Sequence, residues 1–198
     1  MVDIKSYRPE TYSLSTGQVL PRAYGYEEGL NIFIEMADKL SMDMVKKRLK
    51  ASHFSFAINF DGLSLDSGEY TGPVVIDFYG RPMPKGVSGN VRLRVATNST
   101  AEIVSGLKGA FNRLIDPKLY IRRITIAAND IKGMDDEAQI DIFSLSAYDA
   151  ETSMEGELQD VMIAIREKYG NNALIKGMNL EEGSTYIERN NQIGGHRA

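Results

Sequence analysis

One segment constrains the fold more than any other, because its side chains alternate strictly between two faces. From His53 to Phe60 the sequence reads HFSFAINF, which places three phenylalanines and an isoleucine on one face and smaller or polar residues on the other. Such a pattern predicts a half-buried strand. A strand of this kind needs neighbouring strands and a covering layer on its apolar side, so the chain must build a layered sheet.

The elements around this strand follow a doubled order. We expect further strands over residues 12–20, 91–95 and 120–127, because apolar or β-branched residues dominate or alternate there. Apolar residues spaced three to four apart predict helices over residues 30–49 and 103–114, the second opened by a capping-box pair, Ser99 and Glu102. The resulting β-α-β-β-α-β order predicts an α+β fold, a split βαβ, ferredoxin-like sandwich. Both helices then cover one face of a mostly antiparallel sheet and leave the other face free.

The chain also divides by charge and composition. Residues 1–130 carry 17 Lys and Arg against 14 Asp and Glu, whereas residues 131–198 carry 6 against 13. This asymmetry favours an anion-binding body followed by an acidic segment, with an ordinary solvated surface as the alternative. We expect a leader at 1–11, the domain at 12–131 with a hairpin excursion at 61–87, a linker at 132–150, and a C-terminal helix and tail at 151–198.

Several classes of protein are excluded or disfavoured. The chain has no cysteine, no apolar run near the ~20 residues of a membrane helix and no signal-peptide pattern, so we expect a cytoplasmic protein. Its two histidines, His53 and His196, cannot assemble a histidine triad or a zinc cluster. The acidic run 135–137 falls in the predicted linker and is better explained as solvated than as a metal site. We therefore expect no catalytic residue, metal or cofactor in this chain.

Arginines are the residues with the clearest functional pattern. Arg92 and Arg94 are two apart on a predicted strand, which places them about 6–7 Å apart, comparable to successive phosphates. Arg122 and Arg123 open the last strand, and the first strand adds Ser13, Ser15, Gln18 and Arg22. Two interpretations are open: a surface that follows a phosphate backbone, or arginines that only solvate the outer sheet face. His53 is most simply an exposed strand residue, with a phosphate contact as its alternative.

Three segments together resemble the little finger domain of UmuC-like Y-family DNA polymerases. They are KSYRPETYSLSTGQVLPR at 5–22, VRLRVATNSTAEI at 91–103 and LYIRRITIAANDI at 119–131. The resemblance implies a domain that lies in the major groove of primer-template DNA and holds its phosphate backbones. The family's catalytic carboxylates and Mg lie in an N-terminal palm that this sequence lacks, so we expect no polymerase activity from this chain alone. The implied DNA contacts are Ser13, Ser15, Arg22, Arg92, Arg94, Arg122 and Arg123.

A short motif in the predicted linker implies a second partner. QIDIF at 139–143 resembles the pentapeptide Gln-Leu-Ser/Asp-Leu-Phe that binds the bacterial sliding clamp, with isoleucine for leucine at two positions. Gln139 would bind at the rim of the pocket, Ile142 and Phe143 would enter it, and Ile140 and Asp141 complete the motif. The alternative is a short strand that packs its isoleucines on the body.

The combined expectation is a non-catalytic region that binds the DNA backbone and tethers a translesion polymerase to the clamp during DNA repair and the SOS response. The alternative function is a ferredoxin-like protein-interaction or regulatory module that does not bind DNA. Binding to single strands or RNA is disfavoured because the strands lack an exposed aromatic pair. The end of the chain resembles the C-termini of UmuC-like proteins from Gram-positive bacteria, and is either a packed helix with a polar extension or a site for a damage-response partner.

Overall fold

The computed structural model describes residues 12–134, 145–193 and 196–197. Four long strands form one sheet in the order β1-β6-β2-β5, and every neighbouring pair is antiparallel. A short strand, β7 (Lys132–Gly133), pairs with the start of β2. The long strands are β1 (Leu14–Tyr24), β2 (Leu49–Phe60), β5 (Val87–Thr97) and β6 (Ile121–Asn129).

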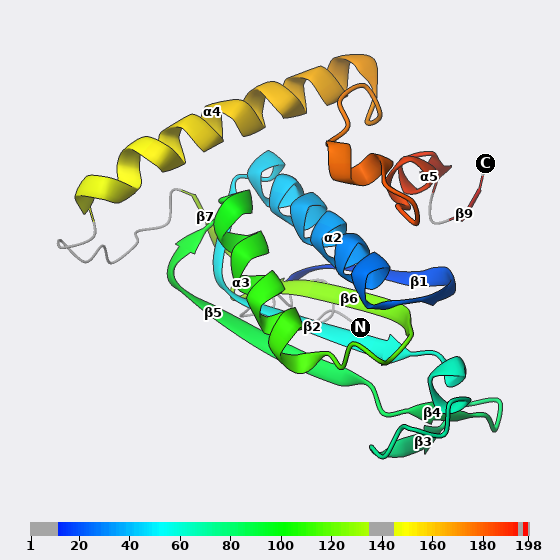
Figure 1. The fold of residues 1–198 in the computed structure, drawn as a ribbon. Coiled ribbons are helices and arrows are strands. Elements are labelled where there is room, and N and C mark those ends of the chain that lie inside the picture. Colours follow the sequence, from blue (N-terminus) through cyan, green and yellow to red (C-terminus); the bar gives the residue numbers. More distant parts are fainter. Residues whose placement is uncertain (1–11, 135–144, 194–195, 198) are drawn as a thin grey trace, which may run out of the picture.

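Two helices, α2 (Tyr26–Lys46) and α3 (Thr100–Leu114), lie side by side on one face of this sheet, and none of the described helices lies on the opposite face (Figure 1). Strand β6 lies between β1 and β2, and β2 lies between β5 and β6. Each strand-helix-strand half is therefore split by a strand of the other half. The predicted split βαβ sandwich is confirmed.

Local sequence explains where the helices begin. Ser99 precedes α3 and its Oγ accepts a hydrogen bond from the Glu102 backbone amide at 3.3 Å, as the capping-box pattern predicts. Helix α2 follows Gly25, whose amide donates to the Glu28 carboxylate at 3.4 Å. Both helices thus start with acidic residues in the first turn, where they interact favourably with the helix dipole.

The core lies between the helices and the sheet and is rich in phenylalanine. Phe33 of α2 is fully buried, and its ring centroid lies 5.1 Å from that of Phe56 and 4.9 Å from that of Phe111. Aromatic pairs at this distance add to the burial free energy of about 1.5–3 kcal/mol per side chain. A Cβ on Gly106 of α3 would lie 3.0 Å from Val91, so this glycine allows the close packing of α3 on β5.

The excursion after β2 begins with a 3-10 turn, η1 (Gly62–Leu65), and contains a hairpin of β3 (Val74–Ile76) and β4 (Pro82–Pro84). It projects from one end of the sheet (Figure 1). Its turn displays Phe78, which is 97% exposed, next to Tyr79.

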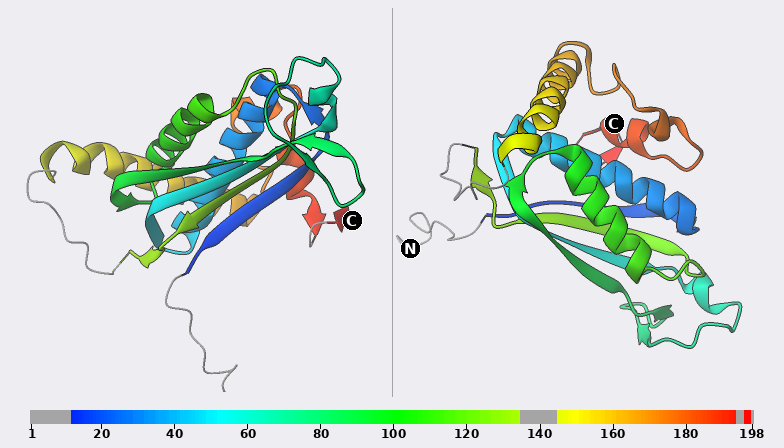
Figure 2. Two further views of the ribbon diagram at one scale, coloured as in Figure 1. Left: turned by 90° about the horizontal axis from the view of Figure 1, so that it is seen from below. Right: turned by 60° about the vertical axis from the view of Figure 1, so that its left-hand side comes forward.

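The C-terminal part runs back across the side of α2 that faces away from the sheet, as Figure 1 and the right-hand view of Figure 2 show. It consists of α4 (Leu145–Tyr169), η3 (Gly177–Leu180), α5 (Tyr186–Asn190) and a small pair, β8 (Gln192–Ile193) and β9 (His196–Arg197). No described helix is both long enough and apolar enough to cross a membrane.

Element boundaries differ from the sequence-based expectation at several places, and two of the differences have a local explanation. Strand β1 runs to Tyr24 instead of ending at residue 20, because Pro21 is tolerated on an edge strand at a register shift. Helix α4 begins at Leu145, inside the expected linker 132–150, in a stretch that contains neither glycine nor proline before Gly156.

Candidate nucleic-acid interface

The sheet face opposite α2 and α3, called the open face below, is lined by small and polar side chains. Cross-strand register aligns Ser15, Ala127, Ser55 and Asn90 in one row across all four long strands. The next row contains Gly17, Thr125, Ala57 and Ser88. These side chains are too short to keep a partner away, so an extended backbone can lie close to the sheet.

Cations lie at the two ends of the open face. In the strand register, Arg92 lies opposite His53 at one end, and Arg123 lies opposite Asn59 and Val19 at the other. His53 and Asn59 are six residues apart on β2, which corresponds to about 20 Å along the strand. The open face therefore offers positive charge at two separate points with hydroxyl and amide groups between them.

Arg92 and Arg94 are exposed and alternate with the half-buried Val91 and Leu93 on the edge strand β5. The register against β2 shifts between Ala51 and His53, so β5 bends away from β2 just past Arg92. Both guanidinium groups thus lie on an edge strand that no further described strand covers. They are available to a partner that approaches the open face.

Two of the arginines proposed as DNA contacts are bound to carboxylates of the body. Arg22 donates two hydrogen bonds to Glu28 and stacks over the Tyr24 ring at 4.3 Å. These hydrogen bonds hold the pKa of the Glu28 carboxyl below its ordinary value. Arg122 occupies a bulge opposite Asn59, and its Nε lies 3.7 Å from Asp61 Oδ2. Each of these arginines would have to leave its carboxylate partner before it could bind a phosphate.

The seven residues singled out from the sequence are thus not one cluster. Ser15, Arg92, Arg94 and Arg123 belong to the open face, and Ser13 is exposed just before β1 begins. Gln18, also noted in the sequence, points to the helix side and donates to Thr185 at 2.9 Å. The motif at 139–143 lies outside the described residues.

Sequence reasoning missed the polar residues in the middle of the open face. Asn129 donates to the Ser55 Oγ at 3.0 Å, and Ser55 lies directly opposite Asn90. The alternation of residues 53–60 already placed Ser55 on the polar face. The cross-strand register that places it opposite Asn90 was not visible in the sequence. His53 Nδ1 lies 3.4 Å from Asp130 Oδ2 at the edge of this group.

A hollow of about 840 Å³ lies between the β3-β4 hairpin and the Arg123 end of the sheet. Three arginines and three aspartates line it, so it has no net charge to attract a polyanion. Arg81 is paired with Asp77 at 2.7 Å, which neutralises part of this lining. Among the described residues, no group of histidine and carboxylate side chains could hold a metal ion.

Two solved structures show the extent of similarity to known proteins. The complex of a beta-clamp processivity factor and the little finger domain of PolIV matches at 7% identity with a TM-score of 0.39, covering 66% of this chain and 96% of that one. The insertion ternary complex of Dbh DNA polymerase matches at 12% identity with a TM-score of 0.35, covering 61% of this chain and 28% of that one. No curated protein matches the chain as a relative.

The family is shown by sequence. Residues 11–142, more than half of the chain, match the impB/mucB/samB family C-terminal domain. This match contains the whole sheet, both of its helices and the open face. The chain therefore belongs to the impB/mucB/samB family and carries its C-terminal domain, the little finger of Y-family DNA polymerases.

Proposed function

We propose that this chain holds DNA for a Y-family translesion polymerase, by contacts between the open face and the phosphate backbones of a duplex. One observation carries the proposal: the four long strands contain no aspartate or glutamate, although acidic residues outnumber basic ones in the whole chain. They contain Arg22, Lys50, Arg92, Arg94, Arg122 and Arg123. Attraction of phosphates depends on this local charge more than on the net charge of −4.

The side chains of the open face suit backbone contacts better than base contacts. Arginine, serine and asparagine are typical ligands of phosphate oxygens, which fix the position of a protein on DNA without reading sequence. The four long strands present no aromatic side chain on the open face, since their phenylalanines and Tyr24 are buried on the helix side. Stacking of unpaired bases on this sheet is therefore disfavoured, and duplex DNA is the better ligand.

Binding of a primer-template duplex tests this proposal. Replacing Arg92, Arg94 and Arg123 together with alanine should weaken binding at least ~10-fold, because three phosphate contacts are lost. Lys118→Ala is the control, since this exposed lysine lies outside the four long strands and pairs with Glu69 at 3.1 Å. If the triple variant binds as tightly as the wild type, DNA does not use the open face.

We also propose that residues 139–143, QIDIF, tether the chain to the sliding clamp. The motif's order of a glutamine and two terminal apolar residues supports this, as does its place just beyond β7. Replacing Gln139 and Phe143 with alanine should abolish clamp binding and leave DNA affinity within ~2-fold. Retained clamp binding in this variant would remove the tether from the proposal.

A protein-interaction module remains the second candidate, favoured by the β3-β4 hairpin. The exposed Ile76, Phe78 and Tyr79 form an apolar tip of the kind that marks protein contacts. A module of this kind would not bind primer-template DNA or would bind it without salt dependence. Measuring primer-template binding at several salt concentrations therefore separates the two functions.

A further inference from the structure

The C-terminal segment, residues 154–191, packs on the outer side of α2 and lies outside the family match to residues 11–142. Three groups of polar contacts, described below, hold it there, together with an exposed ion pair between Lys46 of α2 and Glu167 of α4 at 2.7 Å. These contacts join the segment to α3, to α2 and to β1.

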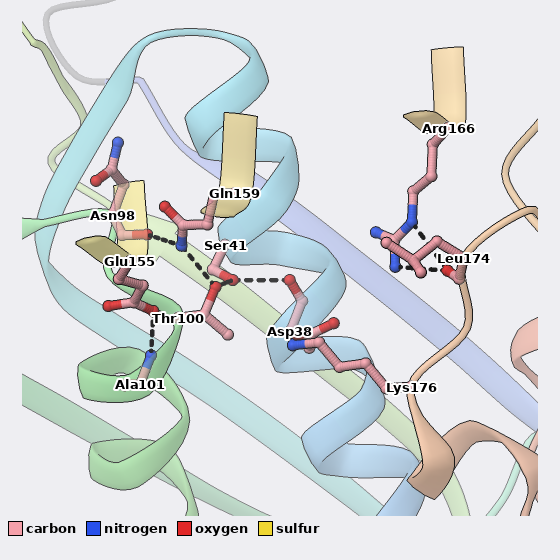
Figure 3. A network of polar contacts seen from close by, with 10 residues as sticks. All are labelled: Asp38, Ser41, Asn98, Thr100, Ala101, Glu155, Gln159, Arg166, Leu174 and Lys176. Atoms are coloured by element: carbon pink, nitrogen blue, oxygen red, sulfur yellow. Dashed lines mark hydrogen bonds and ion pairs between the residues drawn. The ribbon is translucent and has the colours of Figure 1, made fainter. Parts of the chain in front are cut away.

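The first group anchors α4 at the start of α3 (Figure 3). Glu155 accepts hydrogen bonds from the Ala101 amide at 3.0 Å and from the Ser99 hydroxyl at 2.5 Å. Gln159 donates to Thr100 Oγ1 at 2.9 Å. A carboxylate at the N-terminus of a helix is stabilised by the free amides and the helix dipole.

The second group joins the turn around η3 to the middle of α2. Lys176 Nζ lies 2.5 Å from Asp38 Oδ1, and the side chain of Asp38 is only 4% exposed (Figure 3). Asn31 of α2 donates to Glu181 at 2.8 Å. Asp38 is therefore buried by the segment and has its charge balanced by it.

The third group surrounds Glu35 of α2, which is 3% exposed. Ser184 and Thr185 donate to its carboxylate at 3.0 and 3.3 Å. Arg189 of α5 donates to Thr16 of β1 at 3.2 Å and acts on Glu35 electrostatically. Burial raises the pKa of Glu35, despite these hydrogen bonds and the neighbouring arginine, and lowers the pKa of Arg189.

Apolar contacts contribute little to this interface. The buried apolar cluster of the molecule runs from Leu20 to Ala128 and includes no described residue of the segment. Within the segment, Met162 and Tyr186 are the buried apolar residues that the structure describes. Asn179 is buried with neither polar atom of its side chain hydrogen-bonded. Polar groups give up hydrogen bonds to water when such an interface forms, so the net gain in free energy is small. In this respect the interface resembles the polar contacts between domains more than a hydrophobic core.

We propose that residues 154–191 form a releasable latch, which docks on the outer face of α2 and detaches as a unit while the body stays folded. Its release would return Asn31, Glu35 and Asp38 to solvent and leave the apolar core intact. The latch is independent of DNA binding, because the contacts described above join it to α2, to α3 and to the helix side of β1, and not to the open face.

The charge on Glu35 gives the latch a pH dependence. The charged and titratable groups that face Glu35 are Arg189 of α5, Lys39 of α2 and Tyr24 of β1. Docking raises the pKa of Glu35, so the docked state favours its neutral form. Docking is therefore strongest below the ordinary pKa of a glutamate, weakens as the pH rises towards the raised value, and is constant above it.

Hydrogen exchange on the full chain tests the latch. In the wild type, amides of η3 and α5 should exchange together and at least ~10-fold faster than those of β2 and β6, because opening the latch does not require global unfolding. Lys176→Met should speed exchange of η3 and α5 a further ~10-fold, since it leaves Asp38 uncompensated, and leave β2 and β6 unchanged. Lys118→Met, which removes an exposed pair on the body, is the control and should change neither region.

Glu35→Gln supplies a second variant that keeps the size and the hydrogen-bonding capacity of the side chain. Its latch exchange, corrected for intrinsic rates, should lose the pH dependence that the wild type is expected to show above the ordinary pKa of a glutamate. If latch and core amides exchange at one common rate in the wild type and in Lys176→Met, the segment is an integral part of the fold and the proposal is wrong. A pH dependence that persists in Glu35→Gln would assign it to another group.

Discussion

The body presents polar surfaces on two opposite sides, and they differ in charge and in what covers them. The open face has arginines and no carboxylate in its strands, and no described element lies on it. The outer face of α2 carries Glu35 and Asp38, and the C-terminal segment covers it with Arg189 and Lys176. The chain thus places one cation of its own beside each of these two buried carboxylates and leaves the basic surface for a polyanion.

This difference also sets how each surface responds to salt. Arg92 and Arg94 are exposed, so their attraction for phosphates is screened over a Debye length of about 10 Å at 0.1 M salt. The pair of Asp38 and Lys176 is partly buried and is screened less. Salt should therefore release DNA well before it releases the latch.

The largest effect is expected in the core that supports both surfaces. Phe33→Ala removes a fully buried ring and should lower the free energy of unfolding by about 3–5 kcal/mol. Urea denaturation measures this change. Phe78→Ala, at a position 97% exposed, should stay within about 0.5 kcal/mol of the wild type. If Phe33→Ala detached the C-terminal segment but left the body as stable as in the wild type, the two surfaces would not share one core.

A smaller effect is expected from a single hydroxyl in the latch. Thr185→Val keeps the shape of the side chain but removes the hydrogen bonds to Gln18 and Glu35. Latch docking should weaken by about 1–2 kcal/mol, because two buried groups lose a partner. Hydrogen exchange of α5 reports this loss, and primer-template affinity should not change. Weaker DNA binding would couple the two surfaces.

The smallest effect separates free from bound arginines. Arg22→Ala should change DNA affinity by about twofold or less, because Glu28 already neutralises Arg22 and an exposed ion pair contributes little. Arg92→Ala should reduce affinity more, since the Arg92 guanidinium has no carboxylate opposite it in the sheet register. Fluorescence anisotropy of the two variants side by side tests this order. Equal losses would contradict the distinction between the two arginines.

The sequence predicted the body well because its patterns are local. Alternation at residues 53–60 placed the buried face of β2, and Ser99 with Glu102 marked the start of α3. The family resemblance carried by three segments is confirmed by the match over residues 11–142. The alternation and the capping pair each depend on neighbours within a few residues of each other.

Contacts distant in sequence could not be predicted in the same way. Glu35 and Asp38 look like a solvated helix face, and only the return of the chain 150 and 138 residues later buries them. Arg122 looked like a partner of Arg123, but a bulge turns it to Asp61. The polar row of Ser15, Ser55 and Asn90 depends on strand register, which hydrophobic alternation alone does not set.

The salt dependence of primer-template binding tests the central claim most directly. For a wild-type protein that neutralises about four phosphates, log affinity should fall against log salt with a slope of about −3 to −4. Replacing Arg92, Arg94 and Arg123 with alanine should reduce the magnitude of this slope by about 2 to 3. An unchanged slope in the triple variant, or a wild-type affinity that does not depend on salt, would contradict binding of the DNA backbone by the open face.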